Sequence, residues 1–290
     1  MTATPATGAT YTGWSGVAMG TSNPISVTMD GNKSLSANFS GGDVGLPDEC
    51  PGPCNAATPV NPTLLNDGGL GNVTMYSTGP SGGGACNYGS TGVMYYAAIN
   101  VNLTPGDGAG QWQGGEICGQ CAEVSVLTSQ GPKLVVARIM DKCPDANCGI
   151  DLGGAAPASV MLDGSGRYTG KWRFVSCDGH PEVSDGPPSL HVFQGSNAWW
   201  SRVHVRNARM AITTIEWRDA AGTATGFLPF ASDPENTFEV PTADVLQSGM
   251  PSVLITVHYV DGTSATVTLT PAELATPSAS YPLVDAMAMP

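Results

Sequence analysis

The segment Gly71-Asn-Val-Thr-Met-Tyr76, followed by Gly82-Gly-Gly-Ala-Cys-Asn-Tyr-Gly89, opens the part of the sequence that decides the fold. Short β-rich runs separated by turn-forming residues continue from it to Cys177, with one short helix expected over Ala156–Leu162. This pattern is typical of a small closed β-barrel. The β-rich runs are Met94–Val101, Cys121–Leu127, Leu134–Met140 and Lys171–Ser176.

A second domain is expected after the turn-rich stretch Asp178–Pro188. The later strands are short and regularly spaced, as in a β-sandwich. We predict a barrel at residues 66–178, a linker at 179–188, a sandwich at 189–272 and a loose tail at 273–290. The predicted sandwich strands are Leu190–Gln194, Ser201–Asn207, Ala211–Arg218, Phe238–Val240, Val253–Val260 and Ser264–Leu269.

Two segments precede the barrel. Hydrophobic alternation on both sides of Asp30-Gly31 predicts a β-hairpin within residues 1–40. This segment resembles one incomplete copy of the β-repeats of bacterial surface proteins, which implies a spacer. Residues 41–65 form a Gly/Pro-rich linker, in which Cys50 and Cys54 could close a small loop.

Composition narrows the range of partners. The chain has 290 residues, enough for two domains, and its 38 Gly and 23 Pro residues favour strands and turns over helices. Eleven Lys and Arg against 24 Asp and Glu give a net charge of −13. That charge repels nucleic acid, anionic lipid and acidic polymers, so we expect no nucleic-acid or membrane partner. A neutral polymer such as cellulose is compatible with it.

The eight cysteines indicate an oxidising compartment and disulfide bonds. Cys118 and Cys121 have the spacing of a zinc or redox pair, but no second pair of this kind completes a four-ligand zinc site. We therefore expect no metal, no other cofactor and a secreted protein. No apolar run reaches the length of a membrane span, and Met1–Tyr11 lacks the features of a signal peptide, so we expect that a leader is missing from this sequence.

At this point the sequence resembles the expansin family, over roughly residues 66–270. The opening Thr and aromatic pair and the Gly-Gly-Ala-Cys-x-Tyr-Gly run match in order and spacing. The resemblance implies a six-stranded double-psi β-barrel packed against an Ig-like β-sandwich. The further matching segments are Cys118-Gly-Gln-Cys121, Met140-Asp-Lys-Cys-Pro144, Gly149-Ile-Asp-Leu152, Lys171-Trp-Arg-Phe-Val175 and Trp199-Trp-Ser-Arg-Val-His-Val-Arg-Asn207.

The resemblance also implies site residues, partners and disulfides. It places Thr74, Tyr76, Asp141 and Asp151 in a polysaccharide groove and Trp199 with Trp200 on a carbohydrate-binding platform. The implied partners are cellulose and associated matrix glucans, bound by a monomer. The implied disulfides are Cys86–Cys118, Cys121–Cys177 and Cys143–Cys148, which leaves Cys50 with Cys54.

The two aspartates decide between cleavage and binding. Asp141 and Asp151 flank a loop that a Cys143–Cys148 bridge would tighten, and both could face one groove, although turn capping is an alternative role for Asp. Inverting hydrolysis needs an acid and a base. The barrel also resembles family 45 endoglucanases, whose base is an Asp shortly after the Thr-x-Tyr motif. Here Ser77, Thr78 and Gly79 follow Tyr76. We therefore predict wall loosening without hydrolysis.

Exposed aromatic rings stack on the flat faces of sugars. Adjacent strand residues point to opposite faces, so one of Trp199 and Trp200 would be buried unless the strand starts irregularly. In the bacterial members of the family, the platform has a third aromatic residue, and the position that aligns with it here is Glu235. Phe230 or Phe227 could take its place, although we expect both to pack in the core. Trp217 is predicted to be core. No chemistry is assigned to the histidines at positions 180, 191, 204 and 258.

Three rival functions remain open. The first is a glycan-cleaving enzyme, either a family 45-like endoglucanase or a peptidoglycan lytic transglycosylase. The second is a carbohydrate-binding module whose barrel is only a support. The third is a structural surface protein, which the N-terminal repeat favours.

Overall fold

The computed structural model describes residues 1–4, 10–28, 35–40, 68–101, 110–128, 130–145, 148–160, 162, 166–231 and 235–286. The chain divides into two compact units: one contains residues 1–54 with 129–132, and the other contains the rest. The predicted Cys50–Cys54 pair lies outside the described residues. Among the described helices, none has the length and hydrophobicity needed to cross a membrane.

The N-terminal unit contains an antiparallel pair of strands, β1 (Thr10–Gly16) and β2 (Leu35–Ser40). Trp14 is buried, and its indole Nε1 donates a hydrogen bond to the Ser22 carbonyl at 3.0 Å. The predicted hairpin therefore differs from the observed one. The partner of β2 is the segment around Trp14, whereas residues 23–28, which directly precede the Asp30-Gly31 turn signal, form no strand.

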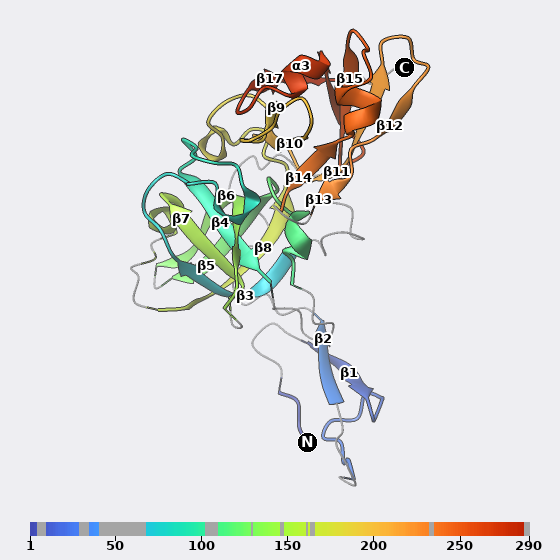
Figure 1. The fold of residues 1–290 in the computed structure, drawn as a ribbon. Coiled ribbons are helices and arrows are strands. Elements are labelled where there is room, and N and C mark those ends of the chain that lie inside the picture. The colour runs from blue at the N-terminus through green and yellow to red at the C-terminus, as the bar shows by residue number, and fades with distance from the viewer. Residues whose placement is uncertain are drawn as a thin grey trace. The chain divides into compact units, whose positions relative to one another are not determined.

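The barrel has six strands, closed in the order β3-β7-β4-β6-β5-β8 (Figure 1). The pairs β3–β7 and β4–β6 are parallel, whereas β3–β8, β4–β7 and β5–β8 are antiparallel. Fully buried side chains such as Ile99, Ile139 and Leu152 form the core of the barrel. The strands are β3 (Gly68–Met75), β4 (Tyr95–Asn100), β5 (Cys121–Thr128), β6 (Gly131–Cys143), β7 (Ile150–Gly154) and β8 (Tyr168–Val175).

Short helical turns connect these strands. The predicted helix near Ala156 is confirmed as α2 (Ala156–Ser159). Among the described residues, 3-10 turns are η1 (Gly84–Cys86), η2 (Gln113–Gly115) and η3 (Pro181–Val183), the last within the predicted linker.

The second domain is a sandwich of two five-stranded sheets, in the orders β13-β14-β10-β9-β17 and β12-β11-β15-β16-β18 (Figure 1). Buried residues alternate along β15, and Trp217 is buried as predicted. The elements are β9 (Ser189–Val192), β10 (Ser201–Arg206), β11 (Ile212–Asp219), β12 (Thr225–Phe227), β13 (Phe230–Ala231), β14 (Thr237–Val240), η4 (Thr242–Leu246), β15 (Val253–Tyr259), β16 (Ser264–Leu269), α3 (Pro271–Leu274), β17 (Ser280–Pro282) and β18 (Val284–Asp285). The mostly β fold, with a closed six-stranded barrel followed by further sheets, is confirmed.

The prediction of a loose tail after residue 272 is wrong. Strand β17 pairs with β9, and β18 pairs with β16, so the C-terminal segment adds one edge strand to each sheet. A capping box at Thr270 and Glu273 starts α3 just before these strands. The sandwich therefore continues to Asp285.

The barrel and the sandwich are joined by buried polar contacts. Arg138 of β6 is 2% exposed, and its guanidinium donates to the carbonyls of Val183, Gly119 and Ala208 at 2.7, 2.8 and 2.6 Å. Burial is the main cause that lowers the pKa of Arg138, to about 10, which leaves it charged at neutral pH. Gln120 accepts a hydrogen bond from the Ala211 amide at 3.0 Å. These contacts pair backbone groups of both domains with barrel side chains.

Three disulfides confirm the pairing that the family resemblance implies: Cys86–Cys118, Cys121–Cys177 and Cys143–Cys148. The first two span 32 and 56 residues, and the third spans 5. Such bridges fit an oxidising environment. Their stabilising effect grows with the length of the loop that they close.

We predict that replacing Cys121 and Cys177 by Ser lowers the free energy of unfolding by about 4 kcal/mol, because the unfolded chain regains the freedom of a long loop. The same change at Cys143 and Cys148 should cost about 2 kcal/mol. Chemical denaturation of both variants measures the difference. Equal losses would show that loop length does not govern the effect.

Candidate functional site

A row of four residues crosses one wall of the barrel. Thr74 of β3 pairs with Asp151 of β7, Asp151 pairs with Ala98 of β4, and Ala98 pairs with Asp141 of β6. Side chains of residues paired in register point to the same face of a sheet. With strands about 4.8 Å apart, the Cα atoms of the two aspartates are about 10 Å apart. The structure thus brings Thr74, Asp151 and Asp141 together, with the small Ala98 side chain between the carboxylates.

Asp151 has the environment of a proton donor. Its side chain is partly buried, and its Oδ1 accepts a hydrogen bond from Thr74 Oγ1 at 2.7 Å. Burial raises the pKa of Asp151 above its usual value, and the negative charges of Asp141 and Asp145 add to the effect, while Thr74 and Arg167 oppose it. Such a carboxyl can offer a proton or a hydrogen bond to a bound hydroxyl.

Asp141 instead supports the loop that follows β3. Its Oδ1 accepts hydrogen bonds from the backbone amides of Ala85 and Lys142, at 2.8 and 2.9 Å. Gly84 lies against it at φ +51°, where an added Cβ would lie 2.4 Å from the Met140 carbonyl oxygen. Only glycine fits such a close approach, which explains the Gly-Gly-Ala-Cys segment. This carboxylate is therefore engaged by backbone donors.

Tyr76 lies next to the row. Its side chain is 41% exposed, and its ring meets the Tyr96 ring edge-on at 5.8 Å. Partial burial, followed by the charges of Asp141, Tyr96 and Asp151, raises the pKa of the Tyr76 phenol, which keeps its hydroxyl neutral. Tyr76 can therefore present both a ring and a hydroxyl to a ligand.

The cysteines beside the row offer no metal site. Ligand atoms of Cys143, Cys148 and Asp151 lie within 4.8 Å of one another. Both sulfur atoms belong to one disulfide, so this group supplies one carboxylate and no thiolate.

Trp199 and Trp200 lie in the turn before β10, and neither is in the core. Trp199 is 74% exposed, and its backbone amide donates to Asn197 Oδ1 at 2.9 Å. Trp200 bridges to Asn197, stacks on the Arg202 guanidinium at 5.3 Å and meets the Phe193 ring at 6.5 Å. The irregular start of the strand therefore prevents the alternation that would bury one of the two rings.

Phe230 and Phe227 are 36% and 63% exposed, so the expectation that both pack in the core is wrong. Phe230 pairs in register with buried Phe238, on the core-facing side of the sheet and at its edge. Arg202 and the Trp200 ring stacked on it lie on the opposite face. The structure thus does not bring Phe230 to the tryptophans.

Glu235, at the position of the third platform aromatic, points to the barrel instead. Its carboxylate accepts from Trp112 Nε1 at 3.1 Å and pairs with Lys142 Nζ at 2.7 Å. Its backbone carbonyl accepts a hydrogen bond from Asn87. Sequence reasoning missed this contact because its members are more than 90 residues apart in the chain.

The closed six-stranded barrel followed by the two five-stranded sheets is a fold of the expansin type. The chain is similar to the apo expansin of Clavibacter michiganensis, with a TM-score of 0.53 and 20% identity over 74% of this chain and 95% of that chain. A mutant expansin of the same organism, in complex with cellohexaose, gives a TM-score of 0.51 and 18% identity over the same shares. These likenesses show the fold.

Residues 1–43 match the family model described as "Divergent InlB B-repeat domain", which agrees with the surface repeat predicted there. No curated protein matches the chain.

We predict that Thr74→Val raises the pKa of Asp151 further, because the Thr74 hydroxyl hydrogen-bonds the ionised carboxylate and its loss favours the protonated form. Carbon-13 NMR of the Asp151 carboxyl, followed against pH, measures the change. Thr214→Val, at an exposed position of the sandwich, is the matched control and should leave this titration unchanged. A lower pKa in Thr74→Val would contradict the assigned environment.

Proposed function

We propose that this protein binds cellulose and associated glucans and loosens their contacts without hydrolysing them. In this proposal, Trp199 and Trp200 hold a glucan surface, while Thr74, Tyr76 and Asp151 hydrogen-bond the hydroxyls of one chain and draw it away from its neighbours. No covalent bond breaks.

The observation that carries the proposal is the different environment of the two aspartates. The pKa of Asp151 is raised, as in a general acid, whereas the Asp141 carboxylate accepts hydrogen bonds from the amides of Ala85 and Lys142. A base must be free to activate a water on the far side of the sugar. Residues 77–79, where related endoglucanases carry the base, contain no carboxyl group. The row thus has a proton donor without its catalytic partner.

The tryptophans support binding of a flat, neutral polymer. An indole that is 74% exposed, beside a second that stacks on Arg202, offers aromatic faces that a monomeric protein rarely exposes without a ligand. The net charge of −13 favours a neutral polysaccharide over an acidic one. The mutant expansin with cellohexaose supports the same ligand class by analogy of fold.

The protein is proposed to act outside the cell. Three disulfides, two of them linking distant parts of the chain, are typical of exported domains. The N-terminal repeat would then be a spacer that connects the two-domain unit to a surface.

The rival proposal is a glycan-cleaving enzyme of the endoglucanase or lytic transglycosylase kind. The raised pKa of Asp151 favours it, because a general acid must be protonated at the working pH. Release of reducing ends from cellulose or of fragments from purified murein would support this alternative.

We predict that Trp199→Ala/Trp200→Ala weakens binding to microcrystalline cellulose about 100-fold, at about 1.4 kcal/mol per ring. A pull-down with an assay for soluble sugar measures both properties. Phe227→Ala removes a ring that is 63% exposed on the other sheet and is the matched control. It should bind like the unchanged protein, and no sample should release sugar.

We predict that Asp151→Ala retains cellulose binding in the same pull-down, because binding rests on the tryptophans. The variant should lose the ability to weaken filter paper, which a separate assay of paper strength measures. If Asp151→Ala kept both cellulose binding and paper weakening, the barrel would serve only as a support. Sugar release by the unchanged protein would contradict the proposed function.

A further inference from the structure

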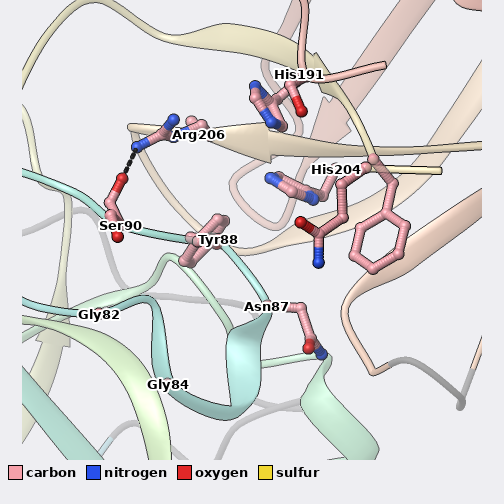
Figure 2. A pocket seen from close by; sticks show the side chains of 12 residues that line it. Gly82, Gly84, Asn87, Tyr88, Ser90, His191, His204 and Arg206 are labelled. Carbon is pink, nitrogen blue, oxygen red and sulfur yellow. Dashed lines mark hydrogen bonds between the residues drawn. The ribbon is translucent and has the colours of Figure 1, made fainter. Parts of the chain in front are cut away.

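A cavity of about 460 Å³ lies between the barrel and the sandwich. The barrel contributes the loop with Gly84, Tyr88 and Ser90, and the sandwich contributes His191, His204 and Arg206 from β9 and β10 (Figure 2). The two histidine rings and the Tyr88 ring lie close together around it in Figure 2. A pyranose ring fits easily within this volume.

His204 is the unusual member of this lining. It is 1% exposed, and neither of its ring nitrogens has a hydrogen-bond partner. Its ring is stacked on His191 at 4.9 Å and meets Tyr88 edge-on at 5.3 Å, contacts that satisfy no polar atom. A buried polar group without a partner costs about 1–3 kcal/mol. A side chain left in this state at a cavity is suited to a ligand that supplies the missing hydrogen bonds.

The lining has little free charge. Burial, His191 and Arg206 lower the pKa of His204 well below its usual value, and burial and Arg206 lower that of His191. Both rings are therefore neutral at pH 7, each with one donor and one acceptor nitrogen. His191 Nδ1 lies 2.6 Å from Ser280 Oγ.

Arg206 contributes no uncompensated positive charge. Its guanidinium donates to the Ser90 carbonyl at 3.1 Å and lies 3.6 Å from the Asp185 carboxylate. The cavity thus combines neutral donors and acceptors with aromatic ring faces. A sugar hydroxyl, which both donates and accepts, matches this chemistry better than an anion does.

The cavity also lies between the two parts of the proposed binding surface. Gly84 lines it and contacts Asp141 of the row. Phe193 lines it as well and contacts the Trp200 ring. The cavity lining thus contacts both the row and the pair of tryptophans.

We propose that this cavity binds one neutral pyranose ring, and that the buried His204 ring turns toward the cavity on binding so that its nitrogens hydrogen-bond the sugar hydroxyls. The inference rests on the proposed function, because it takes the ring to be part of a bound glucan. The ring can be a unit of the main chain or a single-sugar branch. The two sources share the same hydroxyl chemistry, and probes of different shape distinguish them.

The test measures binding of two soluble probes by calorimetry: unbranched cellohexaose, and a cello-oligosaccharide that carries single xylose branches. His204→Phe keeps an aromatic ring of similar shape and removes both nitrogens. The variant should bind at least one of the two probes about tenfold more weakly, which is the effect of one lost hydrogen bond. A loss confined to the branched probe assigns the cavity to a branch, and a loss with both assigns it to the main chain.

His258→Phe is the matched control, since His258 lies on β15 of the other sheet and outside the cavity. It should bind both probes like the unchanged protein. Nitrogen-15 NMR of the imidazoles in the unchanged protein gives a second readout that does not depend on a variant. The His204 signals should move when a probe is added, and the His258 signals should not.

Unchanged affinities in His204→Phe, with static His204 signals, would overturn the cavity proposal. If Trp199→Ala/Trp200→Ala still weakened binding to cellulose about 100-fold in that case, the proposed function would stand. Failure of the unchanged protein to bind either probe or cellulose would overturn both proposals.

Discussion

The arrangement of the two domains depends on one buried cation, the guanidinium of Arg138. It donates to carbonyls of the barrel, of the linker turn and of the sandwich, at Gly119, Val183 and Ala208. A charge buried this deeply is tolerated only when its donors are satisfied, and here that condition needs all three segments in place. The interdomain geometry is thereby coupled to the solvation of a single side chain. Glu235, which contacts Lys142 and Trp112, provides a second and more exposed link between the sandwich and the barrel.

This coupling gives the candidate surface its continuity. The row from Thr74 to Asp141 belongs to the barrel, the tryptophans belong to the sandwich, and the cavity at His204 has walls from both. Arg138 and Glu235 connect the barrel to the sandwich, so a ligand that spans this junction would meet features of both. Binding along an extended surface requires no strained or reactive group. Such an extended surface suits a protein that displaces a polymer chain and leaves the chain intact.

The sequence predicted the parts of this structure that local patterns encode, and it missed those that depend on distant partners. The Gly-Gly-Ala-Cys run and the β-rich segments lead to the barrel, and the family resemblance implied three disulfide pairs that the structure confirms. Strands β17 and β18 were missed because each has at most three residues and β17 ends in a proline, a residue tolerated at sheet edges. His204 alternates with Arg202 and Arg206 along β10, a pattern that predicts exposure. It is buried because the other domain covers it with Tyr88.

We propose that the row binds a glucan chain and does not cleave it. Proton NMR of cellohexaose, incubated with an equimolar amount of the protein for a day, tests both halves of the claim in one sample. We expect broadened or shifted sugar signals from binding, with no new anomeric signals from shorter products. Steady appearance of such signals, abolished by Asp151→Ala, would contradict it and identify a glycosidase.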